Sequence, residues 1–320
     1  MTLLARHAEN LFWIGRYVER AETLARLLGV GSRNALLPNT AGGYRNEWES
    51  ILSASGTRPG FDAKFGDVVE RNVESYLVFD TDNPSSIASC FEHARENARI
   101  VRTALTSQTW DALNGAHREM LDLKRTERSK LSTSDLIDWT IGHASMIRGT
   151  IGDTQLRNDG FDFLNLGAYL ERADATARIL DVKYFVLLPQ IADVGSGLDN
   201  YQWRTILRAL SATRAFNFAY GGEVSATKIA DFLIFNRQAP RSLATCAASV
   251  RSHLDHLARQ YGVDTGAQTR ARAWRERLRG TSVDEVFDTG LHEFLNAEMN
   301  EVAAINTLIS DIYLSGEAVS

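Results

Sequence analysis

The feature that most constrains this chain is a phrase that occurs twice. Residues 14–21 read Ile-Gly-Arg-Tyr-Val-Glu-Arg-Ala, and residues 166–173 read Leu-Gly-Ala-Tyr-Leu-Glu-Arg-Ala. Each copy lies in a long segment where apolar residues recur every three or four positions, on more than one side. This pattern predicts two helices that are largely buried. A Glu-Arg pair at the same register of both helices therefore needs a partner or a role.

Further matches follow the repeated phrase in the same order along both halves of the chain. Collinear matches in tryptophan, proline and cysteine indicate an internal duplication. We predict that Glu19 superposes on Glu171. The other matching landmarks are Leu36-Leu37-Pro38 with Leu187-Leu188-Pro189, Trp48 with Trp203, Pro84-Ser85-Ser86 with Pro240-Arg241-Ser242, and Cys90 with Cys246.

The predicted fold is all-α. Proline occurs only in connections, and no alternating strand pattern persists beyond a few residues. We expect an internally duplicated helical array of two units, residues 1–157 and 158–320, packed as one globule. Each unit has about six helices, and the two long central helices carry the repeated phrase. The main predicted helices cover residues 3–34, 48–54, 67–79, 108–124, 134–153, 161–187, 267–279 and 282–314, with another after Pro84.

Composition excludes several functional classes. A net charge of −5 argues against a general nucleic-acid binder. No segment approaches the run of about 20 apolar residues that a membrane span needs, and charged residues interrupt the N-terminal segment where a signal peptide would be apolar. Two cysteines suggest a reducing compartment, so we expect a cytoplasmic protein.

The Glu-Arg pairs are the main candidate site. Adjacent helix residues point about 100° apart, so Glu19 and Arg20 cannot pair well with each other. One interpretation is a buried cross-brace between the halves. The other is a polar pocket in which arginines fix a carboxylate or phosphate, and it would be asymmetric because Arg16 matches Ala168. The candidate pocket residues are Arg16, Tyr17, Glu19, Arg20, Tyr169, Glu171 and Arg172.

Other charged groups are weaker candidates. The i,i+4 pairs Glu22–Arg26 and Asp174–Arg178 are expected to be solvated. His253 and His256 are spaced to share a metal, but no further ligand pattern accompanies them, so we expect no metal. Both cysteines are expected to be buried packing residues. No nucleotide-binding motif occurs, and we expect no cofactor. The candidate partner-binding residues, near the start of the matching helix in each half, are Arg95, Arg99, Arg102 and Arg241.

Residues 6–21 resemble the opening signature of the bacterial alpha-E family, all-helical proteins with a Glu-Arg motif and no known function. Residues 167–173 and 240–242 also resemble family segments, so the similarity covers essentially the whole chain. Ala168 departs from the pattern, where a basic residue is more usual. The resemblance implies circularly permuted ATP-grasp amidoligases as partners, with transglutaminase-like and proteasome-like peptidases as frequent neighbours. It thereby implies a peptide-synthesis or peptide-modification system.

Two functional hypotheses follow. The first is a non-catalytic subunit that docks on an ATP-grasp amidoligase. The second is an amide-forming enzyme that uses a Glu/Arg pocket between the central helices. A docking subunit should have a closed, ion-paired centre, whereas an enzyme should have an open cleft that reaches Glu19 or Glu171.

Overall fold

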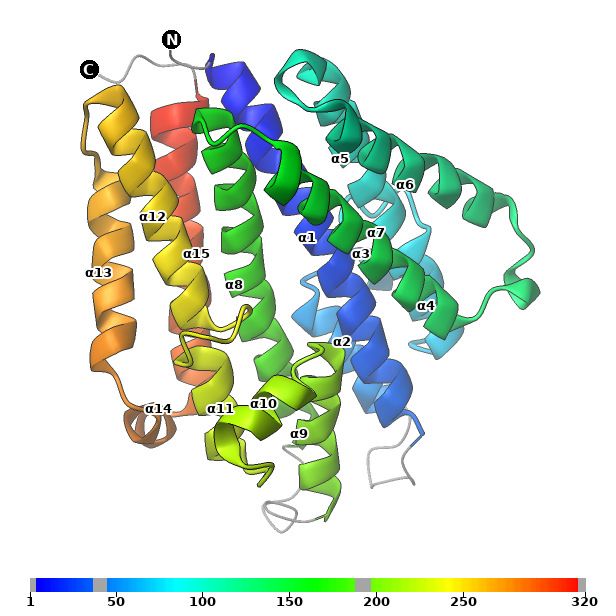
Figure 1. Ribbon diagram of the computed structural model, residues 1–320. Coiled ribbons are helices and arrows are strands. Elements are labelled where there is room, and N and C mark those ends of the chain that lie inside the picture. Colours follow the sequence, from blue (N-terminus) through cyan, green and yellow to red (C-terminus); the bar gives the residue numbers. More distant parts are fainter. Residues whose placement is uncertain (1–3, 37–44, 188–196, 316–320) are drawn as a thin grey trace.

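The computed structural model describes residues 4–36, 45–187 and 197–315, and within these ranges the regular structure is entirely helical (Figure 1). The predicted all-α fold is confirmed. The helices are α1 (Ala5–Asn34), α2 (Arg45–Ala54), α3 (Arg58–Asp62), α4 (Glu70–Val78), α5 (Ile87–Ile100), α6 (Ser107–Arg125), α7 (Thr133–Thr154), α8 (Asp159–Leu187), α9 (Gly197–Ala209), α10 (Thr213–Tyr220), α11 (Ala226–Ile234), α12 (Leu243–Tyr261), α13 (Gly266–Gly280), α14 (Val283–Thr289) and α15 (Leu291–Ile309). A π-helical turn, Ser310–Leu314, continues α15.

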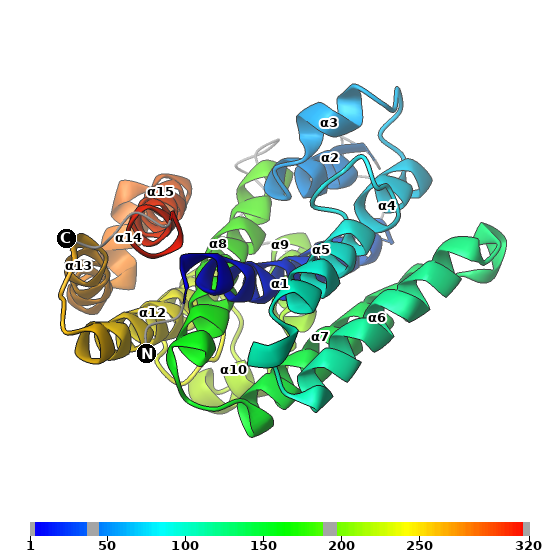
Figure 2. The ribbon, with the colours of Figure 1, turned by 90° about the horizontal axis from the view of Figure 1, so that it is seen from above.

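Two long helices, α1 and α8, cross at the centre of the molecule (Figures 1 and 2). Helices α5 and α7 pack on α1, and α6 packs on both. On the other side, α12 and α15 pack on α8, and α13 packs on both. The short helices α2 and α9 each contact both central helices, so the structure is joined across the predicted boundary at residue 157, which falls in the turn between α7 and α8.

The central helices touch backbone to backbone, and two glycines make this contact possible. A Cβ atom at Gly15 would lie 2.0 Å from the carbonyl oxygen of Leu164 on α8. A Cβ atom at Gly167 would lie 2.0 Å from the carbonyl oxygen of Phe12 on α1. The two contacts are reciprocal, and any side chain at either position would push the helices apart. The repeated phrase therefore marks the crossing point.

Burial on all sides explains why apolar residues occur on more than one side of α1. In α1, all residues from 21 to 31 are buried, so this helix has no solvent-facing side over three turns. The matching landmarks have similar surroundings: Trp48 and Trp203 are both buried, and Cys90 and Cys246 are both fully buried and unpaired as disulfides. These similarities are what a duplication would produce. The duplication, and the division into two units, stay predictions.

The structure corrects the predicted helix at 282–314. It is divided into α14 and α15 at Gly290, where φ is +105°, a value that L side chains rarely adopt. Helices α3 and α10 were not predicted, and α4 is shorter than the predicted segment. The matching residues Leu37, Pro38, Leu188 and Pro189 lie outside the described residues.

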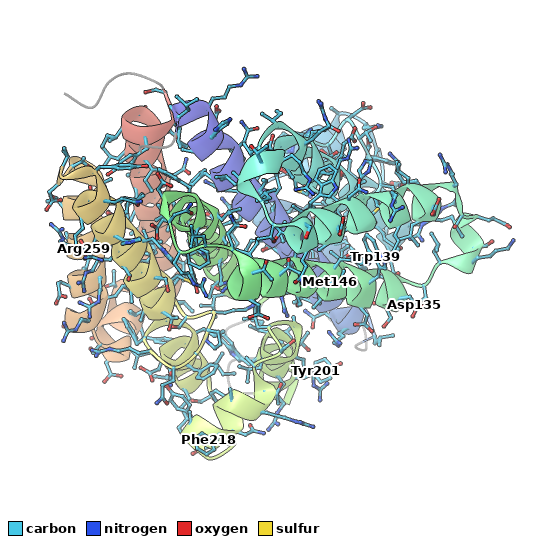
Figure 3. All side chains as sticks on the ribbon, turned by 45° about the horizontal axis from the view of Figure 1, so that its top comes forward. Asp135, Trp139, Met146, Tyr201, Phe218 and Arg259 are labelled. Atoms are coloured by element: carbon cyan, nitrogen blue, oxygen red, sulfur yellow. The ribbon has the colours of Figure 1, made fainter. Side chains whose placement is uncertain are left out.

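The outer surface carries a few large apolar side chains. Phe218 on α10 is 92% exposed and points away from the molecule, and Met146 lies on the outer side of α7 (Figure 3). Within the described ranges, no helix combines the length and apolar character that crossing a bilayer requires.

We predict that Gly15→Ala lowers stability by about 1–3 kcal/mol or more, because the added methyl group meets the backbone of α8 at the crossing. Gly142→Ala on α7 is the matched control. Its Cβ would meet nothing within 4 Å, so it should be neutral or stabilising by about 0.5–1 kcal/mol. Urea denaturation measures both. Equal stability of the Gly15→Ala variant and the parent would contradict the close crossing.

Candidate functional site

The two glutamates of the repeated phrase bind the arginines of each other's helix. Glu19 accepts hydrogen bonds from Arg172, with Nη2–Oε2 at 2.7 Å and Nε–Oε1 at 3.1 Å. Glu171 accepts hydrogen bonds from Arg20, with Nε–Oε1 at 2.7 Å and Nη2–Oε2 at 3.1 Å. Glu19 is 0% exposed and Glu171 is 6% exposed. Both glutamates are therefore buried and each contacts an arginine, as the cross-brace interpretation expects, and the arginine that each one binds comes from the other central helix.

More charges surround Glu19. Arg241, just before α12, donates to it with Nη1–Oε1 at 2.7 Å, and Arg148 of α7 approaches at 3.4 Å. Both of these arginines also bind Glu22, which lies one turn further along α1. Arg26 completes the cluster with an Nη2–Oε1 contact to Glu22 at 2.6 Å. We call these six residues, Glu19, Glu22, Arg26, Arg148, Arg172 and Arg241, the Glu19 cluster.

Two predictions are corrected here. The Glu22–Arg26 pair was expected to be solvated, but Glu22 is 0% exposed and Arg26 is 5% exposed, because α9 and the segment before α12 cover this side of α1. Arg241 was a candidate partner anchor. Its guanidinium instead points into the Glu19 cluster, and its side chain is 13% exposed. We therefore assign Arg241 to the centre of the molecule.

A second cluster surrounds Glu171. Arg16 donates to it with Nε–Oε2 at 2.6 Å, and the same guanidinium donates to Asn306 Oδ1 of α15 at 2.5 Å. Asp174 and Arg178 pair at 2.6 Å, and the Arg178 side chain is 34% exposed, so this pair is more open than Glu22–Arg26. We call these five charged residues, Arg16, Arg20, Glu171, Asp174 and Arg178, the Glu171 cluster.

The predicted tyrosines lie beside these clusters. Tyr17 faces the Arg20 guanidinium at 5.9 Å, and Tyr169 faces the Arg172 guanidinium at 5.1 Å, both measured to the ring centroid. At these distances the ring face attracts the cation. All seven candidate pocket residues thus come together at the crossing of α1 and α8.

Each glutamate also borders a cavity. A cavity of about 330 Å³ beside Glu19 includes Arg148, Arg157 and Ala168 among its lining residues. A larger one, about 430 Å³, lies beside Glu171. The polar residues lining this larger cavity include Arg16, Arg20, Ser85, Asp174, Arg178 and Asn306. The interpretation as one pocket is replaced by two cavities, one for each glutamate.

The surrounding arginines fix the protonation state of the glutamates. Burial by itself would raise the pKa of Glu171, but Arg16 and Arg20 outweigh it and lower that pKa to about 2. Burial would likewise raise the pKa of Glu19, but Arg172, Arg241 and Arg148 hold it far below its usual range. Burial raises the pKa of both cysteine thiols to about 12. At neutral pH both carboxylates are ionised and both thiols are protonated.

The other three candidate partner residues lie on α5 and the turn after it, and they form a separate surface with Trp110 of α6. The guanidiniums of Arg95 and Arg102 lie over the Trp110 ring at 5.8 and 5.3 Å. The Arg99 side chain is 60% exposed, and Ile100 beside it is 44% exposed. We call these five residues the Trp110 surface.

His253 and His256 both contact Asp162, at 2.7 and 2.5 Å from their Nδ1 atoms. Among the residues that the structure describes, no group of three or more His, Cys, Asp or Glu side chains is arranged to hold a metal ion.

Sequence reasoning missed Arg148, Ser85 and Asn306. Arg148 is one of many arginines on amphipathic helices, and nothing near it in the sequence marks it as central. The sequence did contain a sign that Glu22 belongs to the site: the matching position in the second copy of the helix, Asp174, is also acidic.

An all-helical domain built around paired Glu-Arg dipeptides fits one family. The model of the Alpha-E family, described as a predicted alpha-helical domain with a conserved ER motif, matches residues 3–314. This chain belongs to the Alpha-E family.

Three mycobacterial proteins, each named as an uncharacterized protein, are similar to this chain. A protein of Mycobacterium bovis and one of Mycobacterium tuberculosis strain CDC 1551 are each 24% identical over 96% of this chain, and one of strain H37Rv is 23% identical. The match covers 36% of each relative, so the chain spans about a third of their length. No solved structure matches it at a significant level.

We predict that Glu19→Gln costs about 3–5 kcal/mol of stability, because it leaves the surrounding buried arginines without their anion. Arg20→Met should be destabilising for the same reason on the Glu171 side. Glu96→Gln is the control: Glu96 pairs with Arg95 and Arg99 on the surface, and its loss should cost under about 1 kcal/mol. Chemical denaturation of the variants measures the difference. A Glu19→Gln variant as stable as the parent would disprove the buried cross-brace.

The lowered pKa of Glu171 also predicts a pH dependence. A carboxylate with a depressed pKa in the folded state contributes its full stability above the unfolded value of 4.5, and loses that contribution as pH falls toward about 2. We expect the parent to lose stability between these two pH values. Glu171→Gln should be less stable at pH 7 and should lose less stability over the acidic window. Denaturation at pH 7, 4.5 and 3 checks this, and identical slopes for the two proteins would contradict it.

Proposed function

We propose that this chain is a non-catalytic subunit that docks on an ATP-grasp amidoligase in a peptide-synthesis or peptide-modification system of the cytoplasm. The observation that carries the non-catalytic part is the state of the two glutamates. Each is buried, ionised and bound by at least two arginines.

Buried glutamates that stay ionised and bound to arginines are better suited to a structural role than to catalysis. A general acid or base works best with a pKa near the operating pH. Glu171, with a pKa of about 2, stays ionised at neutral pH, and the surrounding arginines hold the pKa of Glu19 far below its usual range. The buried thiols of Cys90 and Cys246, with pKa values of about 12, are poor nucleophiles. The residues that the motif places at the centre are therefore suited to holding helices together.

The docking part of the proposal draws on the relatives. In them the region that matches this chain makes up about a third of the protein, so it is covalently joined to further sequence outside the match. A helical domain that occurs linked to other chain segments is suited to work beside them. The resemblance described above suggests circularly permuted ATP-grasp amidoligases as those partners.

The Trp110 surface is the docking face that we propose. Interface anchors are often arginine and aromatic side chains. Here the guanidiniums of Arg95 and Arg102 lie over the Trp110 ring, and Ile100 is exposed beside Arg99. The arginines offer forked donors to carboxylates of a partner, and the apolar groups offer surface to bury.

The second candidate is an amide-forming enzyme, and one observation favours it. The cavity beside Glu171 brings two carboxylates and three arginines together at a hollow large enough for a small substrate. In that case the arginines would bind an activated carboxylate, and another group would have to accept the proton of the attacking amine. Activity of the isolated chain separates the two candidates.

We predict that the purified chain neither hydrolyses ATP nor joins amino acids, but binds the ATP-grasp ligase of the same genome and changes its ATPase rate. Replacing Arg99 and Arg102 together with alanine should raise the dissociation constant at least about tenfold, since each removes an exposed anchor without unfolding the helix. Arg125→Ala, at the exposed end of α6, is the control and should bind like the parent.

Biolayer interferometry with the immobilised ligase measures the affinity, and a coupled ATPase assay measures the rate. Ligation or ATP turnover by the chain alone would reject the subunit proposal in favour of the enzyme. Equal binding by the parent and the double variant would remove the Trp110 surface from the interface.

A further inference from the structure

The Glu19 and Glu171 clusters differ at one matching position. Arg241 directly precedes Ser242, whose Oγ accepts the Thr245 N–H at the start of α12. Ser85 directly precedes Ser86, whose Oγ accepts the Ser89 N–H at the start of α5. The two positions therefore have the same place relative to a capped helix, one with arginine and one with serine.

In the Glu19 cluster this arginine bridges two carboxylates. Its Nη1 lies 2.7 Å from Glu19 Oε1, and its Nη2 donates to Glu22 Oε1. In the second copy of the helix, the matching carboxylates are Glu171 and Asp174. Both line the cavity of about 430 Å³, and so does Ser85. Under this match, the cavity in one cluster corresponds to the place of the Arg241 side chain in the other. Glu171 and Asp174, the counterparts of the two carboxylates that Arg241 bridges, border the cavity.

The charge of the residues that line this cavity also favours an anionic group. Among the described residues that line it, three arginines (Arg16, Arg20 and Arg178) face two carboxylates, which leaves one positive charge in excess. Arg178 is the most open of the three: its Nε binds Asp174, and its side chain is 34% exposed. A guanidinium has five N–H donors, enough to hold Asp174 and a ligand carboxylate together.

From these two features we propose that the cavity beside Glu171 binds a small zwitterion of the amino-acid class. Its ammonium group lies between Glu171 and Asp174, as the Arg241 guanidinium lies between Glu19 and Glu22. Its carboxylate binds the lining arginines, Arg178 first. A simple amine would add a second positive charge to the lining, and a simple anion would leave the two carboxylates without the bridging donor. This inference stands independently of the docking proposal, since it concerns a different surface of the molecule.

Isothermal titration of the full chain with the common L-amino acids tests the proposal. We expect saturable binding of at least one of them with one site per chain. Two derivatives of that amino acid test the two contacts. The N-acetyl amino acid lacks the ammonium group, and the amino-acid amide lacks the carboxylate. Each should bind at least about tenfold more weakly than the amino acid. Absence of saturable binding by every amino acid would overturn the proposal. Equal binding of either derivative would also overturn it.

Variants locate the site. Ser85→Arg copies the other cluster into the cavity, so it should abolish binding and raise the Tm. Ser85→Ala is the control and should retain binding. Arg178→Gln keeps the fold, because this side chain is partly exposed, and should weaken binding at least about tenfold. Circular dichroism confirms that each variant is folded. Binding that survives both Ser85→Arg and Arg178→Gln would place the ligand elsewhere and reject the site.

Discussion

The contact between the backbones of α1 and α8 determines the rest of this structure. Gly15 and Gly167 let the helices touch, and each glutamate of the repeated phrase lies one helical turn beyond its glycine. At this separation Glu19 reaches Arg172 and Glu171 reaches Arg20, at hydrogen-bonding distance and in bidentate geometry. The glycines and the Glu-Arg pairs therefore act together: the glycines let the helices approach closely, and the ion pairs fix their register.

Burying these charges is energetically demanding. An ionised carboxylate loses several kcal/mol of hydration when it leaves water, and only close, well-oriented partners compensate for that loss. Glu19 has three arginine partners and Glu171 has two. The same partners lower the pKa values and so keep the carboxylates ionised. A centre built in this way favours one helix arrangement over others, and this is why we regard the motif as a structural element with a binding cavity beside it.

More of the fold than of the candidate site could be predicted from the sequence. The all-α class followed from periodicity and proline placement, and the need of Glu19 and Glu171 for distant partners followed from helix geometry. The convergence of Arg148 and Arg241 on Glu19 could not be predicted, because it depends on how α7 and the start of α12 pack on α1. Glu22–Arg26 has the spacing of an ordinary surface pair, and only tertiary packing buries it. The break between α14 and α15 at Gly290 also could not be predicted from the sequence, because glycine permits a positive φ without requiring one.

The central claim is that the ion pairs across the crossing act as pairs. A double-mutant cycle on Glu19→Gln and Arg172→Met, measured by chemical denaturation, tests this most directly. Two residues that share bidentate hydrogen bonds should couple by about 1–3 kcal/mol, and the double variant should lose less stability than the sum of the single losses. Glu19→Gln with Arg20→Met should couple less, because Arg20 binds Glu171. Additive losses for Glu19 and Arg172 would contradict the cross-brace.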